Sequence, residues 1–83
     1  NILYYIMSLI TLLAICIHIC IEHNNSILKT LLYDHAKSKL TKKQIYLLYI
    51  KIASTNKETD FYKIMDKWIS NNSNEMIRQF LFH

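Results

Sequence analysis

The stretch from Ile2 to Ile21 constrains this chain more than any other part of the sequence. Its twenty residues, ILYYIMSLITLLAICIHICI, contain no Lys, Arg, Asp or Glu. A helix rises about 1.5 Å per residue, so this stretch would reach about 30 Å, the thickness of the hydrocarbon core of a bilayer. The sequence therefore predicts a helix that enters or crosses a membrane.

Two membrane roles are open for this helix. As an uncleaved anchor it has the right length, and Tyr4 and Tyr5 would sit at the interface between lipid and water. As an entry signal it offers only an imperfect cleavage site, in which Ala14 and Cys16 provide the small residues. A buried helix of a soluble core is disfavoured, because we expect no other part of the chain to cover it on all sides.

The remainder of the chain is polar, basic and free of helix breakers. The sequence contains no Gly and no Pro, which favours an all-α fold. We therefore divide the chain into a hydrophobic membrane or signal segment, 1–22, and a small, shortened helical domain, 23–83. All Lys and Arg residues lie at or beyond Lys29, and the net charge is +4. The sequence has no pattern typical of base stacking or of reading a nucleic-acid groove. We therefore expect the positive charge to attract an acidic membrane face or an acidic protein partner and not nucleic acid.

Capping signals predict where the helices of the second part begin. Ser26 is placed to cap a helix over 27–39. Thr41 and Gln44 form a capping box for a helix over 42–53, and Thr55 with Glu58 forms another for a helix over 56–69. A last short helix would follow residues 72 and 73, which are its candidate N-caps.

Apolar residues at helical spacing predict the inner faces of these helices. Tyr46 and Leu47 widen the apolar face of the second helix, which predicts packing on two sides. Trp68 and Phe61 bring the largest apolar area to the third helix, and we expect a core role rather than a partner-facing one for them. The candidate core or partner-binding residues are Ile45, Leu48, Phe61, Ile64, Trp68 and Phe80.

Residues that could carry chemistry are few and scattered. The sequence has no nucleophile motif, phosphate loop or H-E-x-x-H pattern, so we predict no enzyme, no catalytic residue and no cofactor. Cys16 and Cys20 share a helix face at i, i+4, but His18 points elsewhere, so four converging zinc ligands are not expected and no metal is predicted.

From Leu40 to Phe80 the sequence resembles exported helical proteins of malaria parasites, the PHIST group with its Plasmodium RESA N-terminal domain. The resemblance is carried by Leu40-Thr41-Lys42-Lys43-Gln44-Ile45, Asp60-Phe61-Tyr62-Lys63-Ile64, Trp68, and Ser73-Asn74-Glu75 leading to Phe80. The export signal of that family has an Arg-x-Leu-x-acid form, and here Thr30 stands where Arg is expected, ahead of Leu32 and Asp34. The resemblance implies a secreted or exported protein that binds host or parasite proteins.

The sequence as a whole predicts a membrane-targeted, non-enzymatic protein-interaction module. One hydrophobic helix would be followed by three to four short amphipathic helices, with protein partners and no small-molecule substrate. The alternative is a single-pass accessory subunit of a membrane complex, anchored by Ile2–Ile21. Either role places the chain at a membrane or in the secretory pathway, and the resemblance adds export to a host cell.

Overall fold

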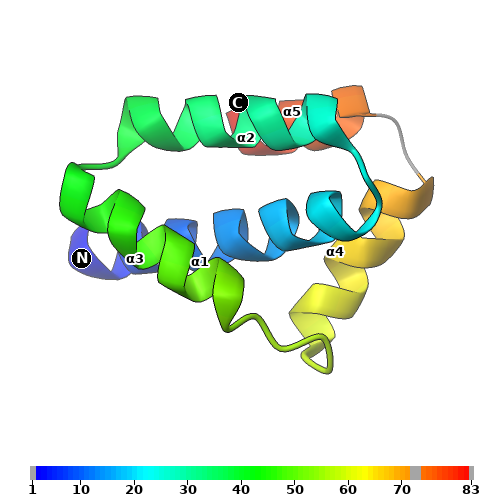
Figure 1. Cartoon of the computed structure of the whole chain (residues 1–83), viewed down its shortest axis with the longest axis horizontal. Coiled ribbons are helices and arrows are strands. Elements are labelled where there is room, and N and C mark those ends of the chain that lie inside the picture. The colour runs from blue at the N-terminus through cyan, green and yellow to red at the C-terminus, as the bar shows by residue number, and fades with distance from the viewer. Residues whose placement is uncertain (1, 72–73, 83) are drawn as a thin grey trace.

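The computed structural model describes residues 2–71 and 74–82, apart from the side chains of Leu3, Phe80 and Phe82. Within these residues the chain forms five helices and no strand, so the predicted all-α fold is confirmed (Figure 1). In chain order the helices are α1 (Ile2–Glu22), α2 (Ser26–Lys39), α3 (Lys42–Ala53), α4 (Asp60–Asn71) and α5 (Asn74–Phe82).

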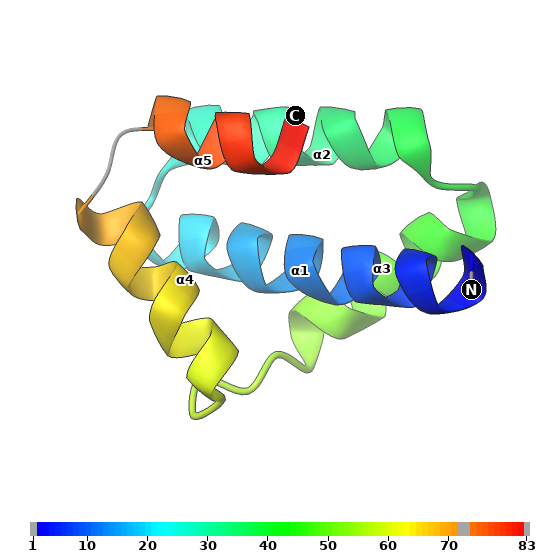
Figure 2. The same cartoon turned by 180° about the vertical axis from the view of Figure 1, so that it is seen from behind.

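Helix α1 lies at the centre of the bundle. It packs against α2, α3 and α4, while α5 packs against α2 and α4. Figures 1 and 2 show α2 running antiparallel to α1, with α5 beside α2 and α4 crossing near the end of α1. Every other helix except α5 is thus arranged around α1.

The second half of α1 is largely buried, although the sequence led us to expect that the rest of the chain could not cover this helix on all sides. Eight of the seventeen buried core residues belong to this helix. They are Ile10, Leu13, Ala14, Ile15, Cys16, Ile17, Ile19 and Cys20. Helices α2, α3 and α4 cover this half of α1, but they leave the first turns and one side of the helix accessible, and less than half of the residues from Tyr4 to Glu22 are buried.

The first turns of α1 remain exposed although they are apolar. Ile2, Tyr4 and Tyr5 each keep more than two thirds of their surface in contact with solvent. Over Tyr4–Glu22 the mean hydropathy is 2.2, so α1 is long and apolar enough to cross a membrane by length and composition. The same helix therefore has the composition of a membrane span and the position of a core helix.

The turn between α1 and α2 is built by two asparagines. Asn24 has a φ of 55°, in the left-handed region, and its N–H donates to the Ile21 carbonyl at 3.3 Å. The Asn25 N–H donates to the Cys20 carbonyl at 2.8 Å, which completes a Schellman motif with asparagine in the place usually taken by glycine. Asn25 then caps α2 by accepting from the Leu28 N–H, so the prediction that Ser26 is the cap was wrong by one residue.

Helix α3 begins and ends where its signals predict. The Thr41 hydroxyl accepts from the Gln44 N–H at 3.3 Å, and the Gln44 side chain accepts from the Thr41 N–H at 2.9 Å. This confirms the capping box and the range 42–53. Tyr46 and Leu47 are exposed, however, so the predicted packing on two sides was wrong.

Helix α4 begins four residues later than predicted. The Thr55 hydroxyl donates backward to the Lys51 carbonyl at 2.8 Å and does not cap a helix. The Asn56 side chain instead accepts from the Glu58 N–H in a tight turn, and Thr59 accepts from the Tyr62 N–H at 3.1 Å. Asx-type turns of this kind compete with helix formation, which explains the later start.

The buried face of α4 also differs from the predicted one. Phe61 and Ile64 are 41% and 50% exposed, so of their two predicted roles the core role does not apply, and the partner-binding role stays a prediction. The buried residues of this helix are Tyr62, Met65 and Ile69. Compared with the predicted orientation, α4 is therefore rotated about its axis, and the stripe of Tyr62, Met65 and Ile69 faces the bundle.

The other candidate core residues have mixed outcomes. Leu48 is buried, and Ile45 and Trp68 are partly buried against the core. The Phe80 side chain and the candidate caps at residues 72 and 73 lie outside what the structure describes.

Candidate functional site

A groove follows one side of α1, between this helix and the segment that joins α3 to α4. It consists of two adjoining cavities of about 170 and 400 Å³, both of which are lined by Thr11 and Lys51. We call it the α1 groove. Its lining residues are Tyr4, Met7, Ser8, Thr11, Ala14, Ile15, Lys51, Ser54, Thr55, Asn56, Thr59 and Phe61.

The floor of the groove is a single stripe of α1. Tyr4, Ser8, Thr11 and Ile15 are spaced by four, three and four residues, which places them on one face of a helix. The Thr11 hydroxyl donates to the Met7 carbonyl at 3.0 Å, so it is satisfied within its own helix. The two hydroxyl residues mark the side of α1 that α2, α3 and α4 leave accessible.

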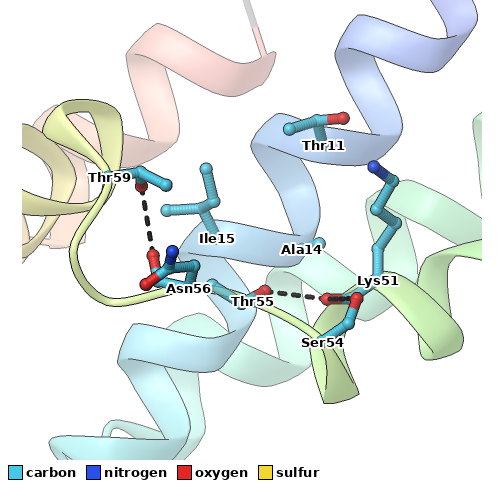
Figure 3. A pocket seen from close by; sticks show the side chains of 8 residues that line it. All are labelled: Thr11, Ala14, Ile15, Lys51, Ser54, Thr55, Asn56 and Thr59. Atoms are coloured by element: carbon cyan, nitrogen blue, oxygen red, sulfur yellow. Dashed lines mark hydrogen bonds between the residues drawn. The ribbon is translucent and has the colours of Figure 1, made fainter.

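Lys51 supplies the positive charge of the groove. It stands in the last turn of α3, where a cation is favoured by the helix dipole. Its carbonyl accepts from the hydroxyls of Ser54 at 3.3 Å and Thr55 at 2.8 Å, which fixes the chain at the end of the helix. Figure 3 shows the Lys51 side chain extending from α3 toward Thr11 of α1.

The opposite wall comes from the α3–α4 segment and the start of α4. The Asn56 carbonyl accepts from the Thr59 hydroxyl at 3.1 Å and holds the segment in a compact turn (Figure 3). Phe61, in the first turn of α4, brings an exposed aromatic ring to the same groove as Tyr4 and Met7. None of the lining residues that the structure describes is acidic, so the groove is suited to an apolar segment that carries an anionic group.

A second polar cluster joins the end of α1 to α4. The Tyr62 hydroxyl donates to Glu22 Oε2 at 2.5 Å, and Lys57 forms an ion pair with the same carboxylate. Burial raises the pKa of the Tyr62 phenol well above its usual range, and the hydrogen bond to Glu22 adds to the shift. Tyr62 is therefore held in its neutral form and acts as a link between two helices.

His18 completes this cluster from inside the bundle. Its ring meets the Tyr62 ring edge-on, with centroids 5.7 Å apart. Its Nδ1 atom is buried and has no hydrogen-bond partner among the described residues. Such an atom costs stability, because it has lost its contact with water without a replacement.

Ser70, His23 and Asp66 lie together but not in the arrangement of a catalytic relay. His23 Nε2 lies 2.7 Å from Asp66 Oδ1, so the ring N–H on this side donates to the carboxylate. Ser70 Oγ lies 3.4 Å from the same nitrogen, and its own hydrogen goes to the Asp66 carbonyl at 2.7 Å. A serine nucleophile would need to donate to one ring nitrogen while the acid binds the other. The three residues instead form an exposed contact between helices.

The described residues contain no group of three or more His, Cys, Asp or Glu side chains that could hold a metal ion. Cys16 and Cys20 are free thiols, and both are fully buried among apolar neighbours. They act as small hydrophobic residues that face the helix bundle.

The groove contains few of the residues that the sequence singled out. Among the candidates whose side chains the structure describes, only Phe61 lines it, and Ile64 is exposed elsewhere on α4. Tyr4, Thr11 and Lys51 were not singled out as site residues. The stripe of Ser8 and Thr11 within an apolar segment was the signal that could have indicated an accessible face.

Comparisons with known protein families, with curated proteins and with solved structures find no match to this chain.

Proposed function

We propose that this chain is a membrane-targeted, non-enzymatic protein-interaction module whose partner binds in the α1 groove. The observation that carries the proposal is the exposure of Tyr4, Met7 and Phe61 around one groove. Large apolar side chains that gather at a concave, accessible place are typical of binding sites for other molecules. Lys51 adds a charge that would orient an anionic group of the partner.

The resemblance to exported parasite proteins specifies the proposal further. It would make the chain a secreted or exported protein that binds host or parasite proteins. An apolar N-terminal helix is compatible with a membrane or signal segment, which is the step that such a route requires.

The groove can be tested by comparing exposed residues of α4. Phe61→Ser removes an aromatic ring from the groove, whereas Ile64→Ser removes an apolar residue that is at least as exposed but lies outside the lining. We expect Phe61→Ser to lose the proteins that co-purify with the chain and Ile64→Ser to retain them. Equal loss in both variants, or retention in both, would contradict a role for the groove.

The accessory-subunit alternative is favoured by one observation, the hydropathy of 2.2 over Tyr4–Glu22. In that role α1 would lie in the lipid and could not fill the core of the bundle at the same time. Cys16 and Cys20 distinguish the two arrangements because both are buried in the bundle.

Thiol labelling on membranes makes this distinction. If α1 is a core helix, a soluble maleimide should label Cys16 and Cys20 once concentrated urea unfolds the bundle. If α1 spans the bilayer, the lipid should keep both thiols protected in urea, and the chain should stay with the membranes in alkaline carbonate. Labelling in detergent and urea is the control for complete reactivity.

A further inference from the structure

The outer face of α3 combines a lysine with exposed apolar side chains. Lys43, Tyr46, Leu47 and Ile50 follow the spacing i, i+3, i+4, i+7, so they form one stripe. All four are exposed; Tyr46 is 66% and Ile50 is 47% accessible. We call this surface the α3 outer stripe.

The stripe points away from the bundle. The opposite side of the helix carries the buried Leu48, and α3 packs against α1. Helix α3 lies in front of α1 in Figure 1 and behind it in Figure 2, so it forms one outer face of the molecule. A helix that is apolar both inward and outward is unusual on the surface of a protein that remains in water.

The charges of α3 are all of one sign. The helix KKQIYLLYIKIA contains three lysines and no acidic residue. Lys42 and Lys43 occupy the first turn, where the helix dipole disfavours cations and favours anions. An anionic surface beside this turn would therefore relieve an unfavourable arrangement as well as pair with two lysines.

We propose that the α3 outer stripe binds the surface of a membrane that contains anionic lipids. Tyr46, Leu47 and Ile50 would enter the boundary between headgroups and acyl chains, where tyrosine is preferred and aliphatic side chains are buried. Lys42 and Lys43 would lie at the level of the negative headgroups. A planar, fluid surface fits a single convex helix stripe, whereas a protein partner would need a complementary groove. The inference specifies the membrane targeting proposed above and rests on it, but it assigns this contact to α3 and not to α1.

Sedimentation of the whole chain with vesicles tests the assignment. The vesicles consist of phosphatidylcholine alone or of phosphatidylcholine with phosphatidylserine. We expect binding to the mixed vesicles that weakens as salt is added, because salt screens the lysines. Lys42→Gln with Lys43→Gln should lower the partition coefficient about 25-fold, at about fivefold per lysine. Tyr46→Ser with Ile50→Ser should lower it as well.

Matched variants on other helices serve as controls. Lys63→Gln with Lys67→Gln makes the same change in net charge on exposed positions of α4. Ile64→Ser with Met76→Ser removes two apolar residues that are each 50% exposed. Both controls should bind mixed vesicles like the unchanged chain, and circular dichroism checks that every variant remains helical.

Any other result would overturn the inference, and the pattern of binding shows which explanation replaces it. Equal losses in the α3 and control variants would indicate a general effect of charge or apolar area. Salt-resistant binding to both kinds of vesicle that survives the α3 variants would assign targeting to α1. Failure to bind any vesicle would remove the proposed membrane targeting too. A dimer that the α3 variants convert to monomer, without lipid binding, would make the stripe a contact between copies.

Discussion

At the scale of single residues, His18 is the polar group that the fold places least favourably. Its Nδ1 atom is buried without a hydrogen-bond partner among the described residues, while its ring packs edge-on against Tyr62. His18→Phe keeps an aromatic ring and removes the unpaired nitrogen. We expect the free energy of unfolding to rise by about 1 kcal/mol and the melting temperature by about 4–8 °C.

Thermal unfolding followed by circular dichroism measures this change. His23→Phe is the matched control, since it removes a histidine that does have a partner, Asp66 at 2.7 Å. The control should leave stability unchanged or lower it. A destabilised His18→Phe chain would mean that Nδ1 makes a contact that the bundle needs.

Tyr62 should make stability depend on alkaline pH. Burial raises its pKa above the ordinary value of 10.0, and the hydrogen bond to Glu22 does so further. A raised pKa in the folded state means that the stabilising contribution is complete below pH 10.0 and is lost as the pH rises through the folded value. We therefore expect urea unfolding above pH 10 to show a steeper loss of stability in the unchanged chain than in Tyr62→Phe.

Tyr33 also has a raised pKa, caused by burial and by Tyr49, so the difference between the two chains is the informative quantity. An identical loss of stability in the unchanged chain and in Tyr62→Phe would show that Tyr62 ionises equally easily in both states.

At the scale of elements, the start of α3 depends on its capping box. Thr41→Ala removes the acceptor of the Gln44 N–H and should cost about 1 kcal/mol. Thr30→Ala is the control, because the Thr30 hydroxyl only donates to the Ser26 carbonyl within α2 and alanine is the best helix former. Urea unfolding should separate the two variants. Equal stability would mean that α3 is fixed by its packing on α1 alone.

The orientation of α4 can be tested with two isoleucines of the same helix. Ile69 is buried and Ile64 is 50% exposed. Ile69→Ala should cost about 2–5 kcal/mol through the cavity that it leaves, and Ile64→Ala should change stability by about 0.5 kcal/mol or less. The reverse order in urea unfolding would restore the apolar face predicted from the sequence.

Local signals explain which elements could be predicted from the sequence. The ends of α3 were predictable because Thr41 and Gln44 satisfy each other's backbone groups within one turn. The start of α4 was not, since Thr55 and Thr59 both offer a cap and the choice depends on the Lys51 carbonyl. The buried face of α4 and the α1 groove could not be predicted from the sequence, for a different reason. Both depend on α1 lying inside the bundle, and the sequence favoured placing it in a membrane.

At the scale of the whole molecule, the packing of α1 determines whether the other helices can form a fold. The five buried Ile and Leu residues of α1 contribute about 1.5–3 kcal/mol each, which is comparable to the entire net stability of a small domain, about 5–15 kcal/mol. Short helices without tertiary packing are marginal in water. The division into 1–22 and 23–83 stays a prediction. The packing of α1 indicates that residues 23–83 need this helix in order to fold.

Truncation tests this dependence. Residues 23–83 alone should give a weak helical signal in circular dichroism and a broad melt without a cooperative transition. A chain that begins at Ile6 is the matched control, because it lacks the exposed Ile2, Tyr4 and Tyr5 but keeps every buried residue of α1. It should melt cooperatively like the whole chain. Cooperative melting of 23–83 would make the second part an independent domain, and α1 would then be free to lie in a membrane while that domain stays folded.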